Sequence, residues 1–288
     1  MYHGIMNVYK EPGYTSHDVV ARLRGILKQK KIGHTGTLDP AAEGVLPVCL
    51  GMGTRLCDML TDRTKTYEAV MLLGMTTDTQ DTTGEVLEDR HHAAMGLEEA
   101  AVTEAVLGYK GDYDQIPPMY SALKVDGKKL YELARAGKEV ERQARQVQIL
   151  EIRVDKVVLP RVWMTVTCSK GTYIRTLCHD IGGKLGCGGC MEHLTRTRVD
   201  RFDIKDSLRL DEIERIRDEG GLDTCILPVE TALEGYAGLK VLPEADAFLY
   251  NGNPCFKGQL DAGDGCLDGR GRPEIQDVRQ QGTFCGCI

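Results

Sequence analysis

The segment from Gly33 to Pro40, with the sequence GHTGTLDP, gathers residue types that can do chemistry in one short loop. It holds two glycines, two threonines, a histidine and a single aspartate, Asp39. Pro40 biases Asp39 toward an extended backbone, and the glycines let another backbone or a ligand come close. Such a loop can present one carboxylate from a rigid backbone, as a nucleophile or a base requires. The competing interpretation is that Asp39 only caps a turn.

The elements around this loop must position it. A capping-box pattern at residues 15–18, followed by apolar residues at helical spacing, predicts a helix over residues 16–29. No regular strand-helix-strand repeat is visible, so we expect an α/β or α+β fold with a mixed, mainly antiparallel sheet. The same patterns predict strands at 66–73, 147–158 and 161–168 and helices at 97–107, 172–185 and 211–219.

Length and composition predict two domains. The 288 residues, with 42% apolar and 27% charged side chains, can bury a sizeable core. From about Leu239 glycine and aspartate become frequent, which predicts a small β-rich domain at residues 236–288 after a larger one at 1–235. No apolar run of about 18 residues and no signal-peptide pattern occurs, so we expect a cytoplasmic protein that does not enter a membrane.

The formal net charge of −7 does not favour binding to nucleic acid by bulk attraction, so the case depends on where the charges lie. Residues 22–31 hold five basic side chains and no acidic one, directly before the Gly33 loop. Residues 124–145 and 161–201 each hold seven basic side chains against four and three acidic ones. Each run alone is typical of a solvated face, but together they flank the segments that carry motifs.

The chain has 11 cysteines. Two cysteine pairs, Cys187 with Cys190 and Cys285 with Cys287, are spaced closely enough for each to supply half of a zinc site. The second pair is C-x-C, however, and about 95 residues separate the two pairs. We therefore expect reduced thiols and no metal site.

The sequence GHTGTLDPAAEGVLP, residues 33–47, resembles the catalytic motif of the TruB family of pseudouridine synthases. Further blocks resemble that family in the same order and extend the resemblance over residues 4–202. They are KEPG with Thr15-Ser16, KTY at 65–67, TDTQDTTG at 77–84, PPMYSALK at 117–124, SKGTYIR at 169–175 and HLTRT at 193–197.

The resemblance implies that the chain isomerises the T-loop uridine (position 55) of tRNA to pseudouridine after flipping it out of the loop. The reaction breaks the bond from C1′ to N1, turns the uracil and joins C1′ to C5, with no metal or redox cofactor. Asp39 matches the family's catalytic aspartate, which can attack C1′, attack the uracil C6 or remove a proton at C2′; the sequence leaves these routes open. One carboxylate suits such chemistry, because a carboxylate stabilises an oxocarbenium-like sugar in glycosidases.

Two further charged residues are implied by the family match. Arg175 would keep Asp39 ionised, and Asp81 would hold Arg175 in place. The alternative for Arg175 is a surface cation in the first turn of a helix, where the helix dipole mildly disfavours it.

Three residues would contact bases. Tyr67 would lie against the flipped uracil and move a proton late in the reaction, although a strand tyrosine is often a core residue. Leu194 would pack on the other side of the base. His34 would replace the stacking that extruded T-loop bases lose, and the alternative is a histidine tied to its loop backbone.

Residues 115–145 would form a basic insertion that closes on the RNA, with salt-dependent phosphate contacts. Four residues in the matching blocks are assigned to RNA or substrate binding on the resemblance: Lys10, Tyr120, Lys124 and Tyr173. Residues 236–288 resemble the family's PUA-like C-terminal domain more weakly, and the chain ends early in the final strand of that domain. The sequence departs from the family pattern at three acidic positions: Glu11, Glu43 and Asp200.

Three classes of function fit the blocks. The first is a stand-alone tRNA enzyme, a monomer that binds one T stem-loop. The second is an RNA-guided catalytic subunit of the dyskerin or Cbf type, which the bacterial form of the 33–47 motif disfavours. The third is a non-catalytic RNA-binding or folding factor, which the intact set of Asp39, Tyr67 and Arg175 disfavours.

Overall fold

The computed structural model describes residues 1–125, 127–233 and 242–245, and the chain divides into two compact units, Met1–Ala232 and Leu233–Ile288. The predicted PUA-like domain lies almost wholly outside the described residues, as do Cys285 and Cys287. The account below therefore concerns the first unit, in which every residue assigned to the site lies.

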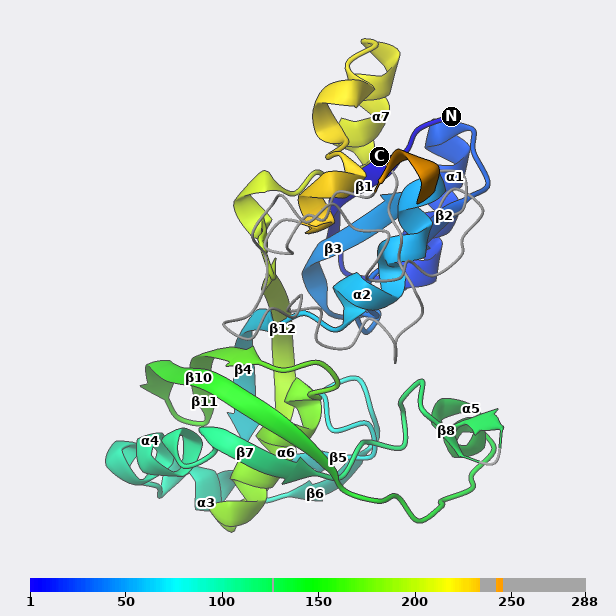
Figure 1. The fold of residues 1–288 in the computed structure, drawn as a ribbon. Coiled ribbons are helices and arrows are strands. Elements are labelled where there is room, and N and C mark those ends of the chain that lie inside the picture. Colours follow the sequence, from blue (N-terminus) through cyan, green and yellow to red (C-terminus); the bar gives the residue numbers. More distant parts are fainter. Residues whose placement is uncertain (126, 234–241, 246–288) are drawn as a thin grey trace. The chain divides into compact units, whose positions relative to one another are not determined.

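A nine-stranded sheet organises the first unit (Figure 1). Its main path runs β1-β3-β12-β4-β11-β10-β7, with β2 paired to β3 and β13 paired to β12. All pairings are antiparallel except that between β3 and β12, which confirms the mixed, mainly antiparallel sheet expected from the sequence. The strands are β1 (Gly4–Lys10), β2 (Ile32–His34), β3 (Glu43–Leu50), β4 (Lys65–Leu73), β7 (Gly111–Gln115), β10 (Arg145–Val158), β11 (Arg161–Cys168), β12 (Gly189–Val199) and β13 (Phe202–Asp203).

One core lies between β1, β2, β3 and two helices, α1 (Ser16–Leu27) and α7 (Leu210–Asp218). The capping box at the start of α1 is formed, because Thr15 accepts from the backbone of Asp18 and Asp18 accepts from the backbone of Thr15. The apolar face of α1 is buried against the strands, so this helix holds the end of β1 and the loop after β2 in place.

A second core lies on the sheet formed by β4, β10, β11 and β12, beneath α4 (Glu99–Leu107) and α6 (Ile174–Lys184). Leu177, Cys178 and Ile181 of α6 are fully buried in it, at 0% exposure. Along β4 and β11 buried and more exposed residues alternate, which is the pattern of a sheet with one covered face.

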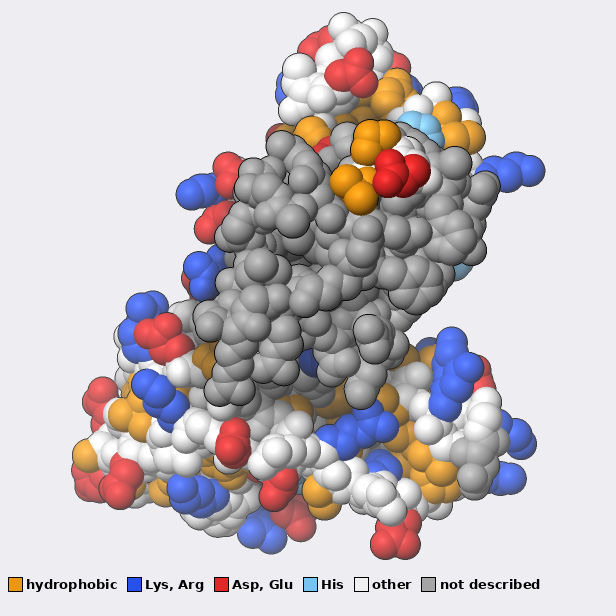
Figure 2. All heavy atoms as spheres, viewed as in Figure 1, with side chains coloured by type: hydrophobic (Ala, Val, Ile, Leu, Met, Phe, Trp, Pro, Cys, Tyr) orange, Lys and Arg blue, Asp and Glu red, His pale blue; other side chains and the backbone are white. Residues whose placement is uncertain are grey.

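The insertion leaves the sheet at Gln115 and returns at Arg145, and these two residues pair directly between β7 and β10. It contains β8 (Lys124–Val125), β9 (Lys128–Lys129) and α5 (Leu130–Arg135). Lys and Arg side chains gather over it in Figure 2. The remaining elements among the described residues are η1 (Gly51–Leu56), α2 (Cys57–Thr61), β5 (Met75–Thr77), β6 (Val86–Asp89), α3 (His91–Met95), η2 (Ile204–Asp206), η3 (Leu222–Cys225), η4 (Val229–Leu233) and, in the second unit, η5 (Pro243–Ala245).

The predicted elements match these with small differences. The helix expected at 97–107 begins at Glu99, and a separate short helix, α3, precedes it. The helix expected at 172–185 begins at Ile174, because Tyr173 keeps an extended backbone. The other strands of the sheet are not among the predicted elements, namely β1, β2, β3, β7, β12 and β13. In β12, polar residues and two register shifts interrupt the alternation.

The described residues include no helix that is long and apolar enough to cross a membrane. Within the same residues no three His, Cys, Asp or Glu side chains form a group that could hold a metal ion. Seven cysteines there carry free thiols, and five of those are buried, as expected for small core residues: Cys49, Cys168, Cys178, Cys187 and Cys190.

Candidate active site

The loop that carries Asp39 joins β2 to β3 and is anchored at several points. The Leu38 backbone N–H donates to the Ser16 hydroxyl at the start of α1, at 2.9 Å. The Leu38 side chain is 3% exposed and belongs to the second core. The N–H and the hydroxyl of Thr35 both donate to the carbonyl of Pro47, at 3.1 and 3.2 Å. Asp39 therefore follows a backbone segment that is fixed by these contacts, as a preorganised site requires.

Lys10 supports the loop from beneath. Its side chain is 0% exposed, and its ammonium donates to the carbonyls of Glu11, Pro40 and Ala42 at 3.1, 3.1 and 2.5 Å. Burial lowers the pKa of Lys10 to about 8, and the negative charge of Asp39 opposes this. In this structure the Lys10 ammonium is buried and its three donors are used by the loop, and the assignment of Lys10 to RNA binding stays a prediction.

Asp39 and Arg175 form the central ion pair of the site. Nε of Arg175 lies 2.9 Å from Oδ2 of Asp39, and Nη2 donates to Oδ1 at 3.1 Å. The carboxylate thus faces a guanidinium, and the alternative that it merely caps a turn does not describe it. The alternative for Arg175, a surface cation, is wrong as well, because this residue is 4% exposed. The hydrogen bond from Nη2 and the close ionic contact at Nε together orient the carboxylate and favour its charged form.

Arg175 also joins three separate segments of the chain. Nη1 donates to the carbonyl of Thr79 and Nη2 to that of Tyr120, each at 2.9 Å. Nη1 lies 3.7 Å from Oδ2 of Asp81. The loop of Asp39, the turn at residues 77–84 and the insertion therefore meet at one side chain of α6.

Burial raises the pKa of Asp39 above its ordinary value, while the charges of Arg175 and Lys10 lower it. The side chain of Asp39 remains 36% exposed, against 5% for that of Arg175. The carboxylate is thus partly open to an incoming group on the side away from its partner. A guanidinium partner together with partial exposure suits a carboxylate that reacts through its exposed side.

The turn at residues 77–84 holds Asp81 rigidly. Oδ1 of Asp81 accepts from the hydroxyl of Thr79 and from the N–H and hydroxyl of Thr83, at 2.8, 2.9 and 2.5 Å. These bonds leave Oδ2 to face Arg175. Glycine fits closely at position 84, because a Cβ there would lie 2.2 Å from Oδ1 of Asp78 and 2.3 Å from Oγ1 of Thr79.

Tyr67 and Leu194 lie on one face of the sheet. Tyr67 of β4 pairs with Arg196 of β12, and Leu194 pairs with Ala69, so all four side chains point to the same side. Tyr67 is 7% and Leu194 is 6% exposed, and both belong to the second core together with Leu38. Burial raises the pKa of the Tyr67 hydroxyl, and the guanidinium of Arg196 opposes this rise. Tyr67 is thus a core residue whose hydroxyl faces the charged groups of the site.

The other residues assigned to the site are His34, Tyr120, Lys124 and Tyr173. Nδ1 of His34 accepts from the Gly36 N–H at 3.4 Å, as in the alternative that ties it to its loop, and burial lowers its pKa. A hydrogen bond to Asp78 raises the pKa of the Tyr120 hydroxyl. Lys124 is exposed on β8. Tyr173 is half-buried at the start of α6.

Four residues that shape the site were not assigned a role from the sequence. Gln115 accepts from the N–H of Tyr173 at 2.8 Å and donates to its carbonyl at 2.9 Å, which ties the insertion to α6. Lys65 is 7% exposed and donates to the carbonyls of Thr61 and Arg63. Ser16 anchors Leu38, as described above. Arg196 is 1% exposed. The signal for Lys65 and Arg196 was their place in the KTY and HLTRT blocks.

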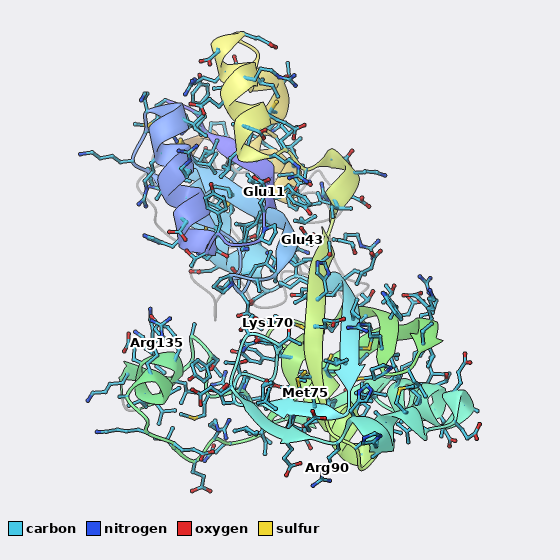
Figure 3. All side chains as sticks on the ribbon, turned by 180° about the vertical axis from the view of Figure 1, so that it is seen from behind. Glu11, Glu43, Met75, Arg90, Arg135 and Lys170 are labelled. Atoms are coloured by element: carbon cyan, nitrogen blue, oxygen red, sulfur yellow. The ribbon has the colours of Figure 1, made fainter. Side chains whose placement is uncertain are left out.

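The acidic departures from the family pattern form contacts of their own. Glu43, which lies beside β12 in Figure 3, accepts from the hydroxyls of Tyr9 and Thr195 at 2.8 and 3.3 Å. Its other neighbour is Nε2 of His193, at 3.2 Å. Glu11 pairs with Arg209 at 2.5 Å and Asp200 with Arg63 at 3.7 Å. None of these contacts includes Asp39 or Arg175.

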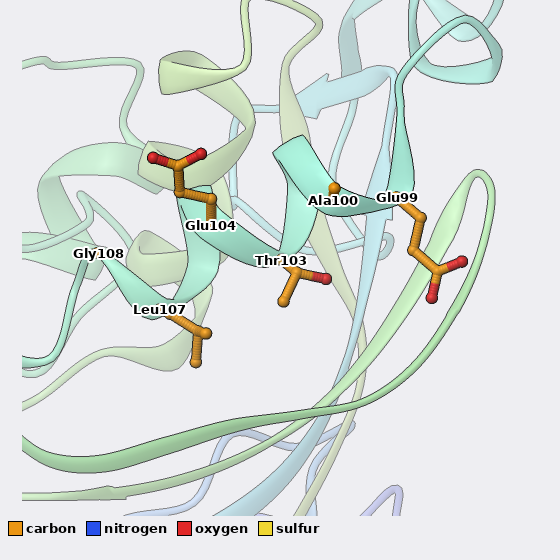
Figure 4. Close-up of a pocket in the computed structure, with 6 residues that line it drawn as sticks. All are labelled: Glu99, Ala100, Thr103, Glu104, Leu107 and Gly108. Atoms are coloured by element: carbon orange, nitrogen blue, oxygen red, sulfur yellow. The ribbon is translucent and has the colours of Figure 1, made fainter.

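A separate surface hollow is lined by one side of α4, with Glu99, Thr103, Glu104 and Leu107 (Figure 4). It contains none of the residues assigned to the site.

Two family models match adjacent parts of the chain. The model "TruB family pseudouridylate synthase (N terminal domain)" matches residues 24–174, and "tRNA pseudouridylate synthase B C-terminal domain" matches residues 175–234. The chain is 55% identical over 259 residues to tRNA pseudouridine synthase B of Lachnoclostridium phytofermentans, covering 87% of this chain and 83% of that protein. It is 44% identical over 258 residues to the protein of the same name from Alkaliphilus oremlandii, covering 90% and 84%.

Two solved structures of complexes contain chains with a similar fold. A Cbf5-Nop10-Gar1 complex contains a chain that matches with a TM-score of 0.71 and 29% identity, over 90% of this chain and 70% of that one. An H/ACA RNP bound to a substrate RNA containing 2′-deoxyuridine gives a TM-score of 0.68 and 27% identity, over 90% and 69%. On the fold, the arrangement around Asp39 and these matches, the chain belongs to the TruB family of pseudouridine synthases.

Proposed function

We propose that this protein isomerises the T-loop uridine (position 55) of tRNA to pseudouridine, with Asp39 as the reacting carboxylate and without a guide RNA. The observation that carries the proposal is the ion pair between Asp39 and Arg175, at 2.9 Å, in a loop held by buried contacts. A fixed, partly exposed carboxylate with a buried guanidinium partner can attack or deprotonate at one defined point.

The charges at the site suit this chemistry. The reaction develops positive charge at C1′ as the bond to N1 breaks, and a nearby carboxylate stabilises that charge or adds to the carbon. Burial raises the pKa of Asp39, and the charge of Arg175 opposes that rise and so favours the ionised carboxylate. Attack at C1′, attack at the uracil C6 and proton removal at C2′ are all compatible with a carboxylate in this position.

A uridine must leave its stack to reach Asp39, and the site offers groups that would receive it. The ring of Tyr67 and the side chain of Leu194 point to the same side of the sheet. Aromatic and apolar side chains compensate for the stacking that a flipped base loses. We assign to His34 the corresponding contact with the extruded loop, as a neutral ring, since burial lowers its pKa.

RNA binding is assigned to the insertion, residues 115–145. Lys124 and Lys128 are exposed there, and Arg135 of α5 lies on the same segment (Figure 3). The carbonyl of Tyr120 bonds to Arg175, so the insertion that would contact the RNA also contacts the partner of Asp39. Tyr173 would complete the pocket, since Gln115 ties it to the base of the insertion.

The relatives named tRNA pseudouridine synthase B support tRNA as the substrate. We propose a monomer that acts on one T stem-loop in the cytoplasm. The matched solved structures are of complexes, a Cbf5-Nop10-Gar1 complex and an H/ACA RNP. A guided subunit is therefore the alternative to test.

The test is release of tritium from tRNA transcripts labelled at uracil C5, because joining C1′ to C5 displaces that hydrogen. The substrates are an unmodified tRNA and the same tRNA with the T-loop uridine changed to cytidine, without any added guide RNA. The enzymes are the wild type, Asp39→Asn and Asp223→Asn, a matched control at an exposed aspartate.

Release by the wild type and by Asp223→Asn, only from the unchanged tRNA, would establish both the reaction and the position. Loss of release in Asp39→Asn with unchanged tRNA affinity would assign the carboxylate. Release that requires a guide RNA would instead favour the guided subunit. Tight tRNA binding without any release by the wild type would favour a non-catalytic RNA-binding factor.

A further inference from the structure

Arg196 lies where three strands of the sheet meet. It pairs with Tyr67 of β4 on one side and with Gly44 of β3 on the other. A guanidinium that is 1% exposed in the middle of a sheet is costly, because burying a charge is unfavourable unless contacts compensate for it. Its contacts therefore need an explanation.

Part of the explanation is the loop of Asp39. Nε of Arg196 donates to the carbonyl of Val45 at 2.7 Å, and Nη1 contacts the carbonyl of Thr37 at 3.5 Å. Thr37 is two residues before Asp39 in the loop. The backbone of β3 reaches this close only because residue 44 is glycine: its φ is +106°, and a Cβ would lie 2.3 Å from the carbonyl oxygen of Arg196.

The third nitrogen, Nη2, is buried and has no hydrogen-bond partner among the described residues. Two neighbouring cations add to the cost of burying this guanidinium, because Lys10 and Lys65 are buried as well. Burial lowers the pKa of each lysine to about 8, and the charge of Arg196 contributes in the same direction. A buried guanidinium beside two ammonium groups, with one nitrogen unused, is unfavourable in the resting protein.

The group that can accept from this nitrogen is the hydroxyl of Tyr67. Directly opposed residues of antiparallel strands have side chains on the same face, a few ångströms apart. The guanidinium is near enough to oppose the rise that burial causes in the pKa of Tyr67. A hydrogen bond from a guanidinium to a phenolate is much stronger than one to a neutral phenol.

We propose that Arg196 is a positioning residue for the reaction, which holds the Asp39 loop through Thr37 and Val45 and stabilises the Tyr67 side chain when its hydroxyl loses a proton. The inference depends on the proposed function for its catalytic meaning. In the last step the Tyr67 phenolate takes the proton on C5, the electron pair of that C–H bond restores the C5–C6 double bond, and N1 takes up a proton from water. The phenol then returns its proton to water. An interaction that strengthens only with the phenolate increases the fraction of Tyr67 that can take up the proton at neutral pH.

The first experiment measures ionisation directly and needs no catalysis. A trifluorinated tyrosine, whose phenol ionises at lower pH than that of tyrosine, replaces Tyr67, and its pKa is followed by fluorine NMR. Arg196→Gln keeps a donor for the Val45 carbonyl but removes the charge, whereas Arg196→Lys keeps the charge. Arg198→Met, an exposed cation on the same strand, is the matched control.

We expect Arg196→Gln to raise the pKa of the probe by about 1–3 units, and Arg196→Lys and Arg198→Met to change it much less. Equal values in Arg196→Gln and the wild type would overturn the inference, as would a probe that stays protonated up to pH 10 in the wild type. If Arg196→Gln does not fold, the guanidinium NMR signals of ¹⁵N-arginine-labelled wild type and Tyr67→Phe are compared instead. The Tyr67→Phe change must shift a slowly exchanging guanidinium signal. An unshifted spectrum would equally overturn the inference.

The second experiment follows single-turnover tritium release against pH. The Arg196→Gln enzyme should lose about tenfold in rate per unit of pKa rise at neutral pH and recover rate as the pH increases, with unchanged tRNA affinity. A purely structural role predicts a loss that is the same at every pH. Failure of the wild type to release tritium would refute the proposed function but would leave the fluorine result interpretable.

Discussion

Replacing Arg175 by methionine tests the central ion pair. Asp39 must be ionised to react, so the rate should rise with pH through the folded-state pKa of Asp39, which burial raises above its ordinary value. Arg175 opposes that rise, and removing it therefore moves the acid limb of the pH-rate profile to higher pH. An opposite charge at 2.9 Å changes a carboxyl pKa by about 1–3 units.

The expected shift lies near the lower end of that range, at about one unit, because 36% of the Asp39 side chain is exposed and water screens the pair. At pH 8 the rate should also fall by roughly 100-fold, since the carboxylate loses its orientation. Arg175→Lys should keep the acid limb closer to that of the wild type but not recover the full rate, because an ammonium lacks the planar fork whose Nη2 hydrogen-bonds Asp39 while Nε lies beside the same carboxylate.

The assay is single-turnover tritium release between pH 5 and 9, with Lys184→Met as the control at an exposed cation of the same helix. An Arg175→Met enzyme with an unchanged acid limb and a full rate would refute the reasoning. A uniform loss of rate without a shift would show that Arg175 orients Asp39 but does not set its charge.

Four further outcomes are expected. Leu177→Ala, at a site with 0% exposure, should lower the free energy of unfolding in urea by about 2–5 kcal/mol; a loss below 1 kcal/mol would contradict the packing of α6. Gly44→Ala should cost more than about 1 kcal/mol in the same assay, because alanine is strained at a φ of +106°. Burial lowers the pKa of Lys65 to about 8. Above that pH the native state therefore binds fewer protons than the unfolded state. The free energy of unfolding should then rise with pH, by up to about 1.4 kcal/mol per pH unit, until the lysine of the unfolded chain also titrates. Lys65→Met should lose that slope between about pH 8 and 10, and an unchanged slope would contradict the assignment. Lys124→Ala should reduce the dependence of log affinity for tRNA on log salt by about one if Lys124 contacts a phosphate, and an unchanged slope would exclude that contact.

Much of the fold could be predicted because its signals are local. The capping box before α1 and the alternation in β11 depend on neighbouring residues alone, and the predicted bounds of β11 match the observed Arg161–Cys168. The strand β12 could not be predicted in the same way. Its buried Arg196 is polar, and its two register shifts disrupt the period of two on which strand prediction depends.

The candidate site could also be predicted only in part: its residue types could, and its distances could not. The types and order of Asp39, Tyr67, Asp81 and Arg175 are visible in the sequence, because each lies in a short block that resembles a family motif. Their distances are not visible, since 136 residues separate Asp39 from Arg175 along the chain. The environment of Lys10 shows the difference most clearly: the motif suggests a residue near the RNA, and the structure places its ammonium on three backbone carbonyls.

The sequence by itself determined the local elements and the chemical groups available, because helix caps, strand alternation and motif spacing are properties of nearby residues. Only the tertiary structure decided which charges share a site. Burial and partners separated by tens of residues made Arg175 the partner of Asp39, made Lys10 a support of the loop, and left Arg196 opposite Tyr67 with one nitrogen unpaired among the described residues. The physical reason is that the pKa and orientation of a charged group depend on desolvation and on contacts in space, and neither is encoded in a short stretch of chain.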